Sequence, residues 1–94
     1  MPIGVLTLEI HIPGAHSLKE KRFVVRKIKD RLRARFNVAV AEVDANDRWQ
    51  RASLGIAALG DDQSIVEGVL RQVTAWVRGT HLVELIQAEE EYVS

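Results

Sequence analysis

The stretch "IGVLTLEIHIPGAHSLKEKR", residues 3–22, decides how the chain begins to fold. From residue 3 to residue 12, large aliphatic side chains alternate with more polar ones, which is the period of a strand with one buried face. Pro13-Gly14 ends that pattern. Ser17 followed three residues later by Glu20 is the signature of a helix capping box, in which the serine hydroxyl accepts a hydrogen bond from the glutamate amide. The stretch therefore predicts a strand, a turn and the start of a helix.

The first helix is followed by two predicted strands. Apolar residues at three- and four-residue spacing continue the helix to Phe36, so one stripe of it is expected to be buried. Residues 37–44 and 49–59 have strand character on either side of a hairpin connection at 45–48. The inward side of segment 37–44 stays open between two sets of aliphatic residues. These sets are Val38 with Val40, and Ala39 with Ala41 and Val43.

A second helix and a last strand complete the pattern. Apolar residues recur at helical spacing over residues 65–77, with either Asp62 or the Ser64/Glu67 pair as the N-terminal cap. Residues 82–89 are the candidate for a short strand. The acidic tail, residues 90–94, is expected to fray.

The resulting order, βαββαβ, predicts an α+β fold. Right-handed crossovers give the ferredoxin-like arrangement, in which a four-stranded antiparallel sheet of order 4-1-3-2 carries both helices on one face. Residues 1–94 are expected to form a single domain, because a 47% apolar composition suits one core and no linker is visible. The other sheet face is left open. The side chains expected on it are Thr7, Glu9, His11, Glu42, Asp44, Arg51 and Ser53.

Two stretches resemble a known family: "GVLTLEIHIPGAHSLKEKR", residues 4–22, and "AEVDANDRWQRASLG", residues 41–55. With the helix and strand that follow, they resemble the YlxP-like domain of unknown function, found in small bacterial proteins. The resemblance covers nearly the whole chain and implies the ferredoxin-like fold. It implies no catalytic residues, because the family has no established activity. Genes of the family commonly lie beside those of translation initiation and ribosome maturation factors, so the resemblance implies work near the ribosome.

The first predicted helix is strongly basic. Residues 17–35 contain nine Lys and Arg against two acidic residues, a net charge of +7, whereas residues 36–94 contain four against ten, a net charge of −6. On a helical wheel, five of the cations fall within about 80° and extend over roughly 21 Å, opposite or beside the buried stripe. We term this set the basic ridge. It consists of Lys19, Arg22, Arg26, Lys29 and Arg33.

Three interpretations of the basic ridge are open. The ridge binds an RNA phosphate backbone through counterion release, with Phe23 as a stacking surface, and ribosome-associated RNA is then the leading partner. Alternatively it pairs with an acidic protein surface or a second copy of the chain, or it is a solvated helix face. We favour the RNA interpretation because the helix contains few acidic partners for these cations. Only Asp30 is spaced to form an ion pair, with Arg26 or Arg33. The sheet lacks the paired aromatics of RNA-recognition sheets, and no readout of DNA sequence is expected.

The open sheet face provides a second candidate surface. Ferredoxin-like domains often cover this face with another copy, so we expect a homodimer through it, with a simple solvated sheet as the alternative. In a homodimer of this kind, the protein is an interaction module whose basic helix meets an acidic surface on its partner.

Most catalytic and metal chemistries are set aside. His11, His16 and His81 do not have the spacing of a compact metal site. No Ser-His-Asp order and no closely spaced pair of carboxylates is visible, and the glycine-rich turn with an arginine that marks an acylphosphatase is missing. We therefore expect a binding module and not an enzyme, without metal or cofactor.

The loop before the first helix is a candidate anion site. The free backbone N–H groups of the loop 13–17 are expected to point toward the space before the helix, with His16, Ser17 and Lys21 as the side chains of the site. The alternative is an ordinary capped helix, with Lys21 at the edge of the core.

Composition also limits the setting of the protein. The sequence contains no cysteine, no signal-peptide pattern at its start and no apolar run of 18 residues. We expect a cytoplasmic protein that does not associate with membranes.

Overall fold

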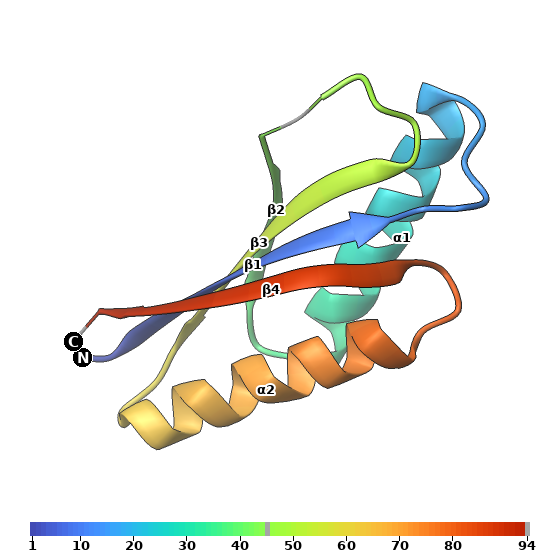
Figure 1. The fold of residues 1–94 in the computed structure, drawn as a ribbon. Helices are drawn as coiled ribbons and strands as arrows, with labels where there is room; N and C mark the ends of the chain where they lie inside the picture. The colour runs from blue at the N-terminus through green and yellow to red at the C-terminus, as the bar shows by residue number, and fades with distance from the viewer. Residues whose placement is uncertain (45, 94) are drawn as a thin grey trace.

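The computed structural model describes residues 1–44 and 46–93 of the 94-residue chain. The strands form one antiparallel sheet of order β2-β3-β1-β4, and both helices lie on the same face of it (Figure 1). This is the predicted order 4-1-3-2 counted from the other edge, so the predicted ferredoxin-like α+β fold is confirmed. The elements are β1 Ile3–His11, α1 Leu18–Arg35, β2 Ala39–Val43, β3 Arg51–Leu59, α2 Gln63–Gly79 and β4 Glu84–Val93.

The two central strands bury the aliphatic residues that the strand period predicted. Even-numbered side chains of β1 and β3, such as Leu8 and Leu54, are fully buried beneath the helices. The buried stripes of α1 and α2 meet them with residues such as Ile28 and Leu70. Full burial of one such side chain contributes about 1.5–3 kcal/mol, so this layer holds both helices on the sheet.

Polar side chains cap both helices. The Ser17 hydroxyl accepts from the Glu20 backbone N–H at 3.1 Å and donates to the Glu20 carboxylate at 3.2 Å, which confirms the predicted capping residues. At α2, the Asp62 carboxylate accepts from the hydroxyl and the backbone N–H of Ser64, each at 2.7 Å. These bonds favour the ionised carboxylate and so lower the pKa of Asp62. Of the two caps considered for this helix, Asp62 is the one in use.

Strand β2 takes the register that the sequence left open. It pairs with β3 so that Val40 stands opposite Ile56 and Glu42 opposite Leu54, and directly paired residues share a sheet face. Glu42 therefore lies on the helix-covered face, and its predicted place on the open face is wrong. Asp44 follows the end of β2 with a φ of 51°, so it is not an open-face strand residue either. The other predicted residues do lie on the open face: Thr7, Glu9, His11, Arg51 and Ser53.

Strand β4 extends further than its sequence predicted. It pairs with β1 as far as Val93, which stands opposite Ile3, so the expectation of a frayed tail is wrong for the described residues 90–93. Backbone groups of β1 on this side need hydrogen-bond partners, and β4 supplies them although three glutamates follow one another there. Ala45, the first residue of the predicted hairpin connection, and Ser94 lie outside the described residues.

Gly4 lets α2 approach β1 closely. A Cβ atom at this position would lie 2.6 Å from Cγ1 of Val66 and 2.7 Å from Cδ1 of Leu70. We predict that Gly4→Ala lowers the free energy of unfolding by about 1–3 kcal/mol through overpacking, measured by urea denaturation. Gly68→Ala is the matched control, because nothing lies within 4 Å of its Cβ and alanine favours a helix by up to about 1 kcal/mol. A Gly4→Ala variant as stable as the native chain would contradict this packing.

Candidate nucleic-acid interface

The basic ridge lies along the flank of α1 that faces the β2 edge of the sheet. Burial of Val25, Ile28 and Leu32 fixes the rotation of α1 and leaves the ridge beside the buried stripe. Arg33 connects the ridge to the sheet, because its guanidinium donates to the backbone carbonyl of Val40 at 2.7 Å. Four ridge side chains are exposed, and the remaining one, Lys29, is half-buried. The exposed ones are Lys19, Arg22, Arg26 and Arg33.

Few carboxylates come near the ridge. Arg33 lies 3.8 Å from the carboxylate of Asp30, one turn earlier on α1, and both side chains are largely exposed. An exposed pair of this kind contributes only about 0.2–0.5 kcal/mol. Within residues 1–44 and 46–93, the other four ridge cations have no carboxylate within 4.0 Å, and this includes Arg26, which Asp30 was expected to reach. The ridge therefore keeps most of its positive charge.

Two other cations of α1 lie over aromatic rings. The Lys27 ammonium is 5.8 Å from the centre of the Phe23 ring, and the Arg35 guanidinium is 5.6 Å from that of Trp76 on α2. These contacts contribute about 0.5–1 kcal/mol each at exposed sites. Phe23 is 66% exposed, so its side chain points away from the core.

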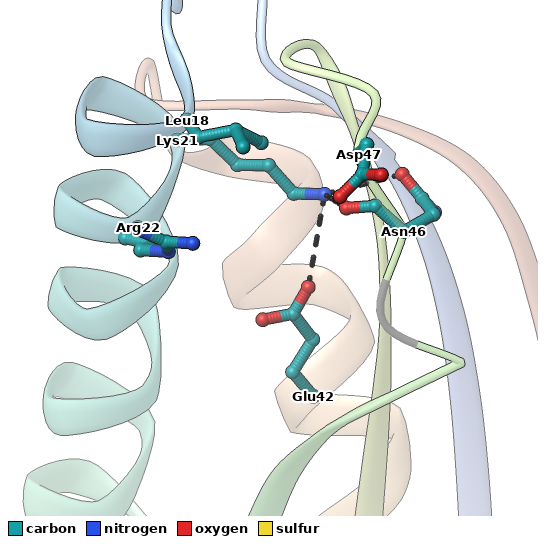
Figure 2. Close-up of a pocket in the computed structure, with 6 residues that line it drawn as sticks. All are labelled: Leu18, Lys21, Arg22, Glu42, Asn46 and Asp47. Atoms are coloured by element: carbon teal, nitrogen blue, oxygen red, sulfur yellow. Dashed lines mark hydrogen bonds and ion pairs between the residues drawn. The ribbon is translucent and has the colours of Figure 1, made fainter.

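Lys21 is buried beneath the β2–β3 connection. The side chain is only 3% exposed, and its ammonium donates to the backbone carbonyl of Asn46 at 2.9 Å and to its side-chain oxygen at 3.2 Å. The nearest oxygen of the Glu42 carboxylate lies 3.8 Å away (Figure 2). Because a buried ammonium is costly unless it is paired and hydrogen-bonded, these contacts explain why Lys21 is tolerated inside.

The three side chains of the predicted anion site are not gathered around one point. The Lys21 ammonium is turned toward Asn46, the Ser17 hydroxyl is bonded to Glu20, and His16 is exposed. Anion binding at the loop before α1 stays a prediction.

A pocket of about 170 Å³ lies next to Lys21, between the first turns of α1 and the β2–β3 connection (Figure 2). Its lining residues are Leu18, Lys21, Arg22, Glu42, Asn46 and Asp47. Arg22 belongs to both the ridge and this pocket, so the two features adjoin. Sequence reasoning missed Glu42 and Asn46 as neighbours of Lys21. One sequence signal could have placed Glu42: alternate residues of a strand share a face, so burial of Val40 would have put Glu42 on the side of α1.

The open sheet face is apolar toward β2 and polar toward β4. Near β1, the Ser53 hydroxyl lies 2.7 Å from each carboxylate oxygen of Glu9. Tyr92 is the one aromatic residue within the described strands, and it stands opposite Gly4 on the helix side. The described part of the open face thus lacks the aromatic residues on which RNA-recognition sheets stack bases. The apolar half forms a shallow groove lined by residues that include Val5, Ala39, Ala41, Val43, Gly55 and Ala57.

The histidines are dispersed. His11 Nδ1 lies 3.3 Å from a carboxylate oxygen of Glu84, whereas His16 and His81 lie in separate loops. In the part of the chain that the structure describes, no three His, Cys, Asp or Glu side chains are grouped so as to hold a metal ion. None of the helices there combines the length and the apolar character needed to cross a membrane.

These features define a small ferredoxin-like α+β protein with a basic flank on its first helix. Residues 3–90 match the family described as "Protein of unknown function (DUF503)". Over 75 residues, 80% of this chain and 82% of the relative, the sequence is 41% identical to the "Uncharacterized protein YlxP" of Bacillus subtilis (strain 168). The chain therefore belongs to the DUF503 family, and the resemblance to YlxP-like proteins is confirmed.

Lys21 has a structural role that stability measurements can test. We predict that Lys21→Met lowers the free energy of unfolding by about 1.5–3 kcal/mol, because the Asn46 oxygens lose a charged donor and Glu42 loses its counter-charge. Lys19→Met is the matched control on the same helix, exposed and unpaired among the described residues, with an expected change within about 0.5 kcal/mol. Urea unfolding measures both variants, and equal stabilities would refute the role given to Lys21.

Proposed function

We propose that the protein is a non-enzymatic binding module that holds single-stranded RNA by its phosphate backbone along the basic ridge, with ribosome-associated RNA in the cytoplasm as the leading partner. One observation carries the proposal. Four of the five ridge cations have no carboxylate within 4.0 Å among the described residues. Cations that the chain itself does not neutralise gain most from an external polyanion.

The placement of the acidic residues supports the same proposal. Glu89, Glu90 and Glu91 lie on β4, which is the edge strand opposite β2, whereas the ridge runs beside β2. Glu42 and Asp47 lie on the ridge side, at the pocket next to Arg22. The three glutamates of β4, however, are separated from a polyanion on the ridge by the width of the sheet.

The length of the ridge sets how many phosphates it can contact. From Lys19 to Arg33 it extends over roughly 21 Å along α1. Four phosphate contacts to single-stranded RNA would give a slope of log affinity against log salt near about −3, at about −0.7 per contact. Phe23 is exposed beside the N-terminal part of the ridge and offers a surface for one base.

Charge reversal on the ridge tests the proposal. We predict that Arg22→Glu combined with Arg26→Glu reduces the salt slope from about −3 to about −1.4 and weakens binding to ribosomal RNA fragments by on the order of tenfold or more. Fluorescence anisotropy across a salt series measures both quantities.

A control pair on α2 distinguishes the ridge from net charge. Arg71→Glu with Arg78→Glu makes the same change in net charge at two exposed positions of the other helix. Binding that responds equally to both pairs would indicate a general charge effect, and binding that responds to neither would refute RNA binding by the ridge.

A second candidate function is a homodimeric protein-interaction module. The groove on the open sheet face supports it, because small and aliphatic side chains of β1, β2 and β3 leave an apolar surface that a second copy would cover. The basic ridge lies beside the sheet and stays free in such a dimer, where it would meet an acidic surface on a partner protein.

Ala41 provides the test of self-association. It is exposed in β2 and lines the apolar groove. We predict that the native chain is a dimer by light scattering and that Ala41→Glu shifts it to monomer, because two carboxylates would be buried at a symmetric contact. Ala75→Glu, at an exposed position of α2, is the matched control and should remain dimeric. A native chain that is monomeric at high concentration would rule this candidate out.

A further inference from the structure

The pocket beside Arg22 points to base recognition at one end of the ridge. Resting on the proposed function, we propose that it receives the Watson–Crick edge of a guanine base from the RNA strand that the ridge holds, with the Glu42 carboxylate as the acceptor that reads it.

The pocket has the position and size for a single base. Its lining includes Arg22, the ridge residue nearest to it, so a strand whose phosphates lie on the ridge passes its opening. A volume of about 170 Å³ is the room of roughly five or six waters at about 30 Å³ each, which suits one planar ring system. Leu18 supplies an apolar wall against which a ring can lie.

The charges of the lining favour an uncharged group with hydrogen-bonding edges. Two cations, Lys21 and Arg22, are balanced by two carboxylates, Glu42 and Asp47. A phosphate in this space would lie against both carboxylates, whereas on the ridge the one carboxylate within 4.0 Å of a cation among the described residues is that of Asp30. The ridge therefore suits the backbone and the pocket suits a base, the usual division between contacts that position a nucleic acid and contacts that read it.

The pocket contains carboxylate oxygens that accept no hydrogen bond from the described residues. The Glu42 side chain is 24% exposed, and its nearest oxygen is 3.8 Å from the Lys21 ammonium, too far for a hydrogen bond. Among the described residues, neither the Glu42 nor the Asp47 carboxylate accepts a hydrogen bond. An ionised carboxylate is an acceptor only, so a ligand that displaces water from it has to bring donors in its place.

Guanine is the RNA base that brings those donors. Its N1–H and N2–H₂ groups are neighbours on the Watson–Crick edge and match the two oxygens of a carboxylate. Adenine, cytosine and uracil each place an acceptor next to the donor on that edge, which a carboxylate repels. Among the described residues, Lys21 uses two of its three N–H groups on Asn46, and the third can donate to guanine O6.

Oligonucleotides with one variable position test the proposal. The probes are uridine tracts that carry a single guanine, adenine or inosine, measured by fluorescence anisotropy with the full chain. The guanine probe should bind about tenfold more tightly than the adenine probe, in keeping with a bidentate base contact. Inosine lacks the N2 amino group and should lose most of this preference without any change to the protein.

Glu42→Gln should remove the guanine preference, because its amide offers one acceptor and one donor where guanine N1–H and N2–H₂ need two acceptors. Glu91→Gln, on the exposed face of β4, is the matched control and should retain the preference. Unfolding measurements establish whether Glu42→Gln is folded. If it is not, the inosine probe still tests the proposal, because it is measured with the native chain.

The outcomes distinguish failure of guanine recognition in the pocket from failure of RNA binding by the ridge. Equal affinities for the guanine and adenine probes, with a salt slope that the ridge variants reduce, would overturn guanine reading and leave the proposed function in place. No binding to any probe would overturn both. Free GMP that binds as tightly as the guanine probe would assign the pocket to a free nucleotide and overturn its role in reading RNA.

Discussion

The alternation of β1 between a helix-covered face and an open face is the constraint on which the rest of this structure depends. β1 pairs with β3 along one side and with β4 along the other. Its register therefore determines which side chains of both neighbours lie on the helix-covered face. A slip of one residue would turn Glu9 and His11 into the core and expose Leu8 and Ile10. Both helices bury their apolar stripes against this single face, and their rotation follows from it.

The rotation of α1 determines where its positive charges lie on the surface of a protein whose net charge is zero. Once Val25, Ile28 and Leu32 face the sheet, the cations of α1 divide between two flanks. On one flank Lys27 and Arg35 lie over aromatic rings, and on the other the basic ridge runs along the β2 edge. Because the strand order places β4 at the opposite edge, its glutamates lie away from the ridge. In the proposed function, this separation, and not the total charge, favours an extended polyanion as the partner.

Lys21 couples the fold to the candidate site. Its ammonium bridges α1 to Asn46 and Glu42, so one buried charge fixes how the β2–β3 connection sits on the helix. The same contact explains why Glu42 is tolerated on the covered face of β2, where its neighbours across the strands are aliphatic. The pocket beside Arg22 exists because these side chains, distant in the sequence, converge there.

Local periodicity was enough to predict the element order, the capping by Ser17 and the position of the ridge, because strands, caps and helix faces depend on residues a few positions apart. The family resemblance was carried by equally local stretches, residues 4–22 and 41–55. Local patterns could not predict the register of β2 or the extent of β4. The register of β2 is set by hydrogen bonding to β3, and the extent of β4 is set by hydrogen bonding to β1. The partner of Lys21 is the clearest case: its nearest oxygens come from residues 21 and 25 positions away, and only the packing of α1 across the sheet brings them within reach.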